Sequence, residues 1–290
     1  MGGSSRPDAS AIETKRSKGL PTLKMPLKAR WQHDLPMLAY GIKPDESHKI
    51  EDLVAMAIKN GYYNLDLSEC TPSQEAEFGP ILEKVSPDRY LDKYKFRNKL
   101  FLTMKLPSLH VTDVKQQFTE SYSRVSPSWV NMYLLPAPRN GISDRDLQKA
   151  WADLEMISRT GGLQIGVSDF TRANLETILA TAKIPPMMNR VEKDIAVMGY
   201  GPLSAPTDAS RRIAAVHNVT EADVAMRWCI DQGMIAVTSS TNGQRLQGYV
   251  KHLSSFELAP REIEAISEEG EQMKHYEGCK WSARFTADRR

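Results

Sequence analysis

Apolar and polar positions follow two patterns along the chain, and the two patterns alternate regularly. Short apolar runs such as LPMLAYG, YYNLDL and KLFLTMKL are each followed by a stretch with apolar residues at helical spacing. In the first such stretch Ile50, Leu53, Val54 and Ala57 fall on one helical face, and Gly61 stands at the stop position. The short runs therefore predict buried strands, and the stretches between them predict amphipathic helices.

The alternation continues far enough to predict a closed barrel. Five more strands are expected at SWVNMYLL, LQIGVSDF, MMNRVE, DIAVMGYG and MIAVTSS. Strands that alternate with helices lie parallel, and strands that are apolar throughout are buried on both faces. Eight strands in about 250 residues fit a (β/α)8 TIM barrel better than an open doubly wound sheet. Its functional residues would lie where the carboxyl ends of the strands meet, which we call the barrel mouth.

One connection in this barrel is shorter than expected. MMNRVE and DIAVMGYG are separated by at most Lys193, whereas parallel neighbours need a crossover of a dozen or more residues, usually a helix. We therefore expect the crossover helix between strands six and seven to be missing. Either the barrel is distorted there, or one segment only passes along the surface. A gene model that skipped coding sequence would produce the same pattern.

The two ends of the chain differ from its middle. Residues 1–34 are rich in Gly, Ser, Pro, Lys and Arg without the apolar core of a signal peptide, so we expect a loose N-terminal tail. Residues 35–272 form the expected barrel, and the basic, poorly periodic residues 273–290 form a C-terminal tail. The basic end could also serve as a lid over a pocket, although a tail docked on the surface fits better.

Composition narrows the class of protein further. Apolar residues make up 41% of the 290, and the net charge is +2, so neither a membrane nor nucleic acid is expected as a partner. The 3 cysteines show no disulfide framework and no metal-ligand spacing. We expect a cytoplasmic monomer without a metal site.

The strand ends and the segments beside them resemble those of the aldo-keto reductases over roughly residues 35–270. The matching segments, in order, are AIKNGYYNLD, LFLTMKL, MYLLPAP, AWADLEMI, GVSDF, IPPMMNRVE, GYGPLS, VAMRWCIDQG and SSTNGQRL. Each is weak alone, but the full ordered set is specific for the fold. The resemblance implies NADP(H)-dependent interconversion of small-molecule carbonyls and alcohols.

The resemblance also implies a catalytic tetrad, of which only two members are present. A tyrosine acts as the acid, a lysine lowers its pKa, an aspartate pairs with the lysine and a histidine orients the carbonyl. Asp66 and Lys105 match the aspartate and the lysine. Thr71 or Pro72 stands where the tyrosine should be, and Pro136 replaces the histidine. Asp66 and Lys105 are equally well explained as a retained structural ion pair.

Other residues near the missing acid are weak substitutes. The hydroxyls of Ser68 and Thr71 are too weakly acidic, and Glu69 or Cys70 could donate a proton only if the backbone redirected it. Losing general acid–base help costs on the order of 10² to 10⁴ in rate. Ordinary carbonyl reduction should therefore be impaired.

The cofactor site implied by the resemblance is kept only in part. Ser168 would hold the nicotinamide carboxamide and Tyr200 would stack on the ring, with Leu203 nearby. Asp169 and Arg190 replace the usual Asn and Gln, and we expect them to form an ion pair that fills the carboxamide site.

The end of the site that binds the 2′-phosphate is also altered. In SSTNGQRL, Ser240, Thr241 and Arg245 remain, but Ser239 replaces the usual Lys. One cation in place of two predicts weakened NADP binding. Read alone, this segment is also an ordinary helix N-terminus.

Three functions follow from this pattern. The first is an aldo-keto reductase with impaired or altered catalysis. The second is a non-catalytic scaffold that binds a nucleotide or a partner through the same barrel. The third is an enzyme that shapes a substrate without hydride transfer.

Overall fold

The structure is a computed structural model of the 290-residue chain. It describes residues 14–15, 20–23, 35–43, 48–86, 90–107, 109, 114–125, 130–139, 141–190, 196–200 and 207–272.

Eight parallel strands close into a barrel, as the sequence predicted. They pair in the order β10-β11-β4-β5-β6-β7-β8-β9, and β9 pairs with β10 to complete the ring. Their bounds are β4 (Leu38–Gly41), β5 (Asn64–Asp66), β6 (Phe101–Lys105), β7 (Met132–Pro136), β8 (Gln164–Ser168), β9 (Met188–Arg190), β10 (Ala196–Tyr200) and β11 (Ile235–Thr238). The (β/α)8 prediction is confirmed.

The connection between β9 and β10 confirms one expectation and overturns another. Only residues 191–195 separate the strands, so the usual crossover helix is missing. The expectation that one segment only passes along the surface was wrong, because Ala196 and Val197 pair in parallel with Met188 and Asn189. Since β9 has only 3 residues, the chain must return about 7 Å along the barrel. Five residues span that distance easily.

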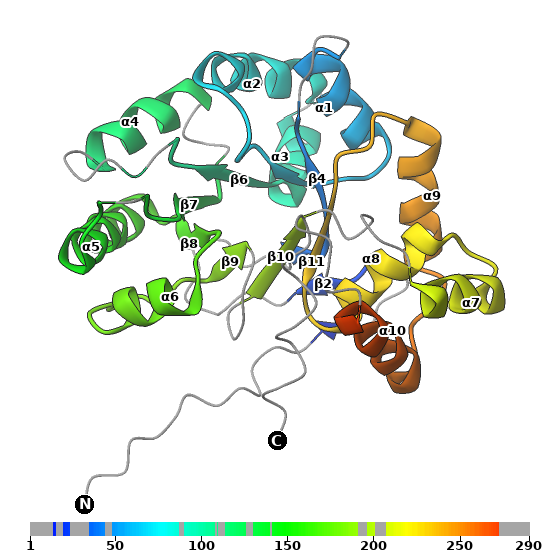
Figure 1. The fold of residues 1–290 in the computed structure, drawn as a ribbon. Helices are drawn as coiled ribbons and strands as arrows, with labels where there is room; N and C mark the ends of the chain where they lie inside the picture. The colour runs from blue at the N-terminus through cyan, green and yellow to red at the C-terminus, as the bar shows by residue number, and fades with distance from the viewer. Residues whose placement is uncertain are drawn as a thin grey trace, which may run out of the picture.

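Helices surround the strands (Figure 1). Their bounds are α1 (Ile50–Lys59), α2 (Pro72–Val85), α3 (Tyr90–Lys99), α4 (Val114–Val125), α5 (Asp144–Gly161), α6 (Arg172–Leu179), α7 (Asp208–His217), α8 (Glu221–Asp231), α9 (Gly243–Leu253) and α10 (Pro260–Gln272). Capping boxes begin α2, α6 and α8 at Thr71, Thr171 and Thr220. In each, a threonine hydroxyl and a side chain three residues later satisfy backbone N–H groups that the helix leaves without partners.

A small antiparallel sheet precedes the barrel. Its strands are β1 (Thr14–Lys15), β2 (Thr22–Leu23) and β3 (Leu35–Pro36), paired in that order. The Met37 amide, just before β4, donates to the Pro21 carbonyl at 3.0 Å. The expectation of a loose tail is therefore not met at β1 and β2, while most of residues 1–34 and all of 273–290 lie outside the described residues.

The core fills the barrel and the layer between strands and helices. The large side chains of Tyr40, Tyr62, Tyr133 and Trp151 are among those fully buried in it. Gly166 in β8 allows a close approach, because a Cβ there would lie 2.7 Å from the Met188 carbonyl oxygen. This glycine lets β8 pack against the short strand β9.

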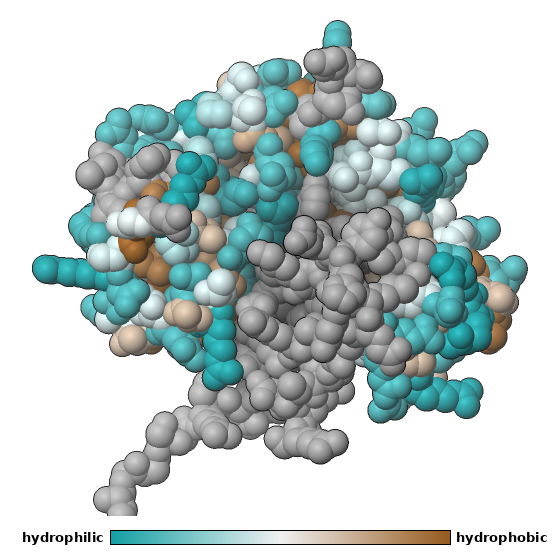
Figure 2. Space-filling model, viewed as in Figure 1, coloured by the Kyte–Doolittle hydropathy of each residue, from teal (hydrophilic) through white to brown (hydrophobic). Residues whose placement is uncertain are grey.

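On the face seen in Figure 2, hydrophilic side chains cover much of the described surface, and apolar ones form small separate areas. The large exposed apolar side chains, Leu91, Met156, Leu179 and Val216, come from four different helices. Among the described helices, none has the length and apolar character needed to cross a membrane.

Candidate functional site at the barrel mouth

The loop after β5 begins the site. Asp66 ends β5 and is buried, and its Oδ1 accepts a 2.9 Å hydrogen bond from the Ser68 amide. The Cys70 amide donates to the Leu67 carbonyl at 2.9 Å and closes a four-residue turn. This turn places Glu69 beside the ends of β6 and β9.

Glu69 joins two cations across the mouth. Its Oε1 lies 3.1 Å from Lys105 Nζ at the end of β6 and 2.7 Å from Arg190 Nη1 at the end of β9. Arg190 Nε lies 3.6 Å from Asp66 Oδ2. Asp66, Glu69, Lys105 and Arg190 form what we call the mouth cluster. Its two carboxylates balance its two cations.

Neither of the two expected ion pairs, Asp66 with Lys105 and Asp169 with Arg190, is the one that forms. Lys105 pairs with Glu69 rather than with Asp66, because the guanidinium of Arg190 takes the place beside Asp66. Arg190 likewise pairs with Asp66 and Glu69, and within the described part of the chain Asp169 acts on it only at longer range. Burial alone would lower the pKa of Arg190, but the charge of Asp66 and the hydrogen bond to Glu69 raise it. Arg190 therefore stays charged.

The residues at the position of the missing acid, Thr71 and Pro72, begin helix α2. Thr71 is exposed, caps α2 and accepts from the Gln74 amide at 3.4 Å, while its own amide donates to Gln74 Oε1 at 2.8 Å. Pro72 occupies the first helical turn, where its missing N–H costs nothing. The residues that stand where a tyrosine was expected thus have a structural use in starting α2.

The neighbouring groups are poor proton donors. Burial alone would raise the pKa of Glu69, but the hydrogen bond from Arg190 and the charge of Lys105 lower it below the ordinary value. Burial, with the nearby carboxylates, raises the pKa of Cys70 to about 12, and its thiol lies 3.7 Å from the Ile42 carbonyl oxygen. Pro136 ends β7 beside Ser168 and has no side-chain donor. The turn after β5 therefore makes Glu69 the partner of two cations, and it does not present Glu69 as a proton donor.

The residues expected to hold the carboxamide bind each other. The Ser168 hydroxyl donates to Asp169 Oδ2 at 2.9 Å, and Asp169 adopts a left-handed conformation with φ 60. Asn and Asp are the non-glycine residues that tolerate this region best. Tyr200 is the last residue of β10, and Leu203 lies outside the described residues. The hydroxyl of Ser168 is therefore already used within the protein.

The loop after β11 has a different character. The Ser240 amide donates to Thr238 Oγ1 at 3.4 Å, the Asn242 amide donates to Ser240 Oγ at 3.2 Å, and Asn242 caps α9. Thr241 and Arg245 are exposed, and the side chain of Arg245 has no ion-pair partner among the residues described. A helix N-terminus with an available arginine suits a phosphate group.

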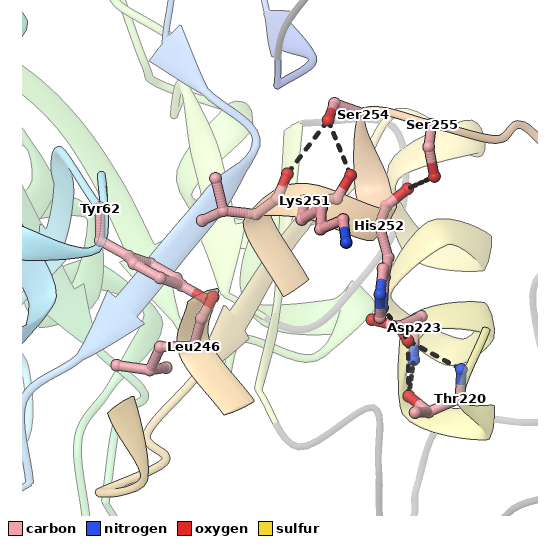
Figure 3. Close-up of polar contacts among 9 residues, drawn as sticks. Tyr62, Thr220, Asp223, Leu246, Lys251, His252, Ser254 and Ser255 are labelled. Atoms are coloured by element: carbon pink, nitrogen blue, oxygen red, sulfur yellow. Dashed lines mark hydrogen bonds and ion pairs between the residues drawn. The ribbon is translucent and has the colours of Figure 1, made fainter. Parts of the chain in front are cut away.

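Helix α9 is held firmly from two sides (Figure 3). The Tyr62 hydroxyl donates to the Leu246 carbonyl at 3.1 Å, and His252 Nδ1 lies 2.8 Å from Asp223 Oδ2 in α8. The same Asp223 oxygen accepts from the amide and hydroxyl of Thr220 at 2.8 and 2.6 Å. These contacts fix the direction of α9, whose N-terminal turn carries Arg245.

Comparison with known proteins agrees with this architecture. Residues 37–198, more than half of the chain, match the model of the aldo/keto reductase family. The chain belongs to this family.

Its relatives include proteins that are named as reductases. The chain is 27% identical to a 7-acetyl-epi-neemfruitin B aldo-keto reductase of Melia azedarach, over 85% of this chain and 88% of that protein. It is 24% identical to an NAD/NADP-dependent indole-3-acetaldehyde reductase of Schizosaccharomyces pombe, over 83% and 96% of the two chains. An aldo/keto reductase from Brucella melitensis shares the fold with a TM-score of 0.68, 21% identity and coverage of 89% and 99%.

Sequence reasoning missed one role in the site. The sequence suggests Glu69 only as a substitute acid, whereas in the structure Glu69 links Lys105 and Arg190. The sequence offered one signal for this role. Glu69 stands three residues after Asp66 and just before a helix that begins with a proline. The partners come from β6 and β9, which are distant in the sequence but converge at the barrel mouth.

Proposed function

We propose that this chain is an NADP(H)-binding member of the aldo-keto reductase family in which ordinary carbonyl reduction is impaired or replaced. The observation that carries the proposal is the capping role of Thr71, which stands where the acid was expected. Arg190 and Lys105 lower the pKa of Glu69 against the effect of burial, and burial raises the pKa of the Cys70 thiol, so neither group suits the role of the tyrosine. The named relatives are reductases of small molecules, which supports a small-molecule carbonyl or alcohol as the ligand.

The residues present suit the 2′-phosphate end of the cofactor better than its nicotinamide end. The N-terminal turn of α9 and the exposed Arg245 suit the 2′-phosphate, and Ser240 and Thr241 stand in the same loop. At the nicotinamide end, Ser168 already donates to Asp169, and Arg190 is turned to two carboxylates. The cofactor would supply a hydride when bound. We expect weakened binding that depends mainly on Arg245.

Calorimetric titration with NADPH and NADH tests the binding. NADPH should bind and raise the melting temperature. Replacing Arg245→Ala should weaken NADPH about tenfold and leave NADH unchanged, because one charge-assisted contact to the 2′-phosphate is lost. Arg159→Ala, an exposed arginine on α5, serves as the matched control. Absence of heat and of a thermal shift at millimolar NADPH would remove the cofactor from the proposal.

Steady-state assays with NADPH and a panel of aldehydes and ketones test the chemistry. We expect turnover far below the 1–10³ per second typical of enzymes. Turnover within that range would show that the tetrad is functionally replaced, and the claim of impairment would be wrong.

A second candidate is a non-catalytic scaffold on the same barrel. The observation that favours it is the mouth cluster, which places charged side chains where a substrate and a nicotinamide would meet in the family. NADPH binding without turnover fits a nucleotide-binding scaffold, and turnover of any assayed carbonyl at an enzymatic rate excludes it.

A further inference from the structure

The chain contains three Asn-Gly pairs, which are Asn60–Gly61, Asn140–Gly141 and Asn242–Gly243. An asparagine that precedes glycine can react with the backbone, because the missing Cβ leaves the glycine nitrogen open to close approach. That nitrogen attacks the side-chain carbonyl carbon, a five-membered succinimide ring closes and ammonia leaves. Water then opens the ring to aspartate or isoaspartate. Asn140 lies outside the described residues, so the comparison is between the other two pairs.

The pair Asn60–Gly61 is held in a way that opposes this reaction. Asn60 caps the C-terminus of α1 with φ -92 and ψ 7, and its Nδ2 donates to the Met56 carbonyl at 2.8 Å. The Gly61 amide donates to the Ile58 carbonyl at 3.0 Å. A nitrogen whose proton is engaged in such a bond is a poor nucleophile, and the asparagine side chain is turned back along the helix. The fold therefore protects this pair.

The pair Asn242–Gly243 differs at both reacting groups. Asn242 is exposed and its backbone is extended, with φ -96 and ψ 107. Gly243 is the first residue of α9, so its N–H precedes the hydrogen-bond ladder of the helix. Within the described part of the chain this N–H has no acceptor. The nucleophile of the pair is thus available, and the residue that carries the electrophile is open to solvent.

The start of α9 also activates the electrophile. Asn242 Oδ1 accepts a hydrogen bond from the Arg245 amide at 3.1 Å, which draws electrons away from the carbonyl carbon that is attacked. Negative charge develops on this oxygen as the ring closes, and a hydrogen-bond donor aimed at such an oxygen stabilises it. The positive end of the helix dipole acts in the same direction. The capping contact therefore assists ring closure.

We propose that Asn242–Gly243 is a site of spontaneous deamidation, which replaces a neutral amide at the start of α9 with a carboxylate. Aspartate caps a helix as well as asparagine does, and a negative charge suits a helix N-terminus, so the aspartate form stays folded. The new carboxylate lies in the turn that carries Arg245. The consequence for the cofactor rests on the proposed function. There the carboxylate repels the 2′-phosphate of NADPH, and the affinity falls as the protein ages.

Ageing the full chain at mildly alkaline pH, without cofactor, tests the site by peptide mass spectrometry. In the folded protein Asn242 should convert on the order of tenfold faster than Asn60, because only its pair has a free nucleophile. In urea, where the fold no longer protects Asn60, the two rates should become similar. Gly243→Ala should slow the conversion of Asn242, because a methyl group crowds the attacking nitrogen. That methyl group would meet Met56 and Asn60 at 3.7–3.8 Å, which are ordinary contact distances.

Calorimetric titration of fresh and aged protein tests the consequence. Aged wild type and fresh Asn242→Asp should bind NADPH about tenfold more weakly than fresh wild type, because one like charge is added beside the 2′-phosphate. Asn242→Ser keeps a helix cap that cannot deamidate, so its affinity should not change with age. The melting temperature shows whether Gly243→Ala is folded, and if it is not, Asn242→Ser serves as the control that does not age.

Three results would overturn the proposed site. These are an intact Asn242 after ageing, equal conversion of Asn60 and Asn242 in the folded chain, or unchanged conversion in folded Gly243→Ala. An aged protein that carries the carboxylate and binds NADPH like the fresh protein would overturn the consequence. If fresh wild type binds no NADPH, the proposed function fails, while the mass spectrum still decides whether Asn242 is modified.

Discussion

At the ends of β5, β6 and β9 four charged side chains bind one another, whereas at the loop between β11 and α9 an arginine is exposed. Asp66 and Arg190 are nearly fully buried, and their partners are supplied by the barrel itself. Arg245 lies on a well-anchored helix with no ion-pair partner in the described part of the chain. Each charged side chain of the first region forms an ion pair with another member of the mouth cluster, whereas Arg245 in the second region is exposed.

A buried charge and an exposed charge place different demands on the residues around them. A buried charge is tolerated only with a partner, so Arg190 in place of a glutamine requires carboxylates around it. An exposed charge carries no such requirement. The charged residues at the ends of β5, β6 and β9 therefore occur as a set of ion pairs, whereas Ser239 in the loop after β11 is exposed.

Removing a charge from the buried region should have the largest effect. Asp66→Ala removes the buried carboxylate that lies 3.6 Å from Arg190, and we expect a loss of about 3–5 kcal/mol in the free energy of unfolding. Arg245→Ala should change it by no more than about 0.5 kcal/mol. Urea unfolding of both variants measures the contrast. Equal stability of Asp66→Ala and wild type would mean that the mouth cluster contributes nothing to the fold.

Adding a charge to the exposed region should have a smaller effect that is confined to the cofactor. Ser239→Lys places a second cation in the loop before α9, and we expect NADPH to bind about tenfold more tightly. NADH, which lacks the 2′-phosphate, should bind as before. Calorimetric titration of both nucleotides gives the ratio. A similar gain for NADH would place the new lysine away from the 2′-phosphate site.

Restoring the missing acid should cost stability without restoring activity. Thr71→Tyr removes the cap of α2 and should lower the free energy of unfolding by about 1 kcal/mol, while Thr71→Ser should keep it. Combined with Pro136→His, the variant should still not reduce aldehydes with NADPH, because Asp66 and Lys105 remain paired with Arg190 and Glu69. Robust NADPH-dependent reduction by the double variant would show that the cluster gives way to substrate.

The smallest effect concerns pH. The pKa of Glu69 is lowered from its ordinary 4.5 in the folded state, so its contribution to stability is complete above about that pH. The contribution is lost as pH falls through the lower, folded-state pKa. Wild type should therefore exceed Glu69→Gln in melting temperature near neutral pH, and the gap should close in acid. A gap that is constant with pH would show that the charge of Glu69 does not stabilise the fold.

Local sequence patterns predicted most of the fold, because buried strands and amphipathic helices are periodic. They also located the ends of β5, β6, β8 and β9, where Asp66, Lys105, Ser168 and Arg190 lie. They did not predict which charges would pair. The rule for crossover length does not hold between β9 and β10, because it assumes strands of ordinary length and β9 has 3 residues.

The order of residues along the chain was enough to predict the barrel, the absent helix between β9 and β10, and the lack of a tyrosine and a histidine at their expected positions. Each of these depends on residue identity or on spacing along the chain. The ion pairs of Arg190 with Asp66 and Glu69, the ion pair of Lys105 with Glu69, and the capping role of Thr71 are seen only in the folded barrel. Ion pairs form between groups that the closed barrel brings within a few ångströms, and those distances exist only once β5, β6 and β9 converge.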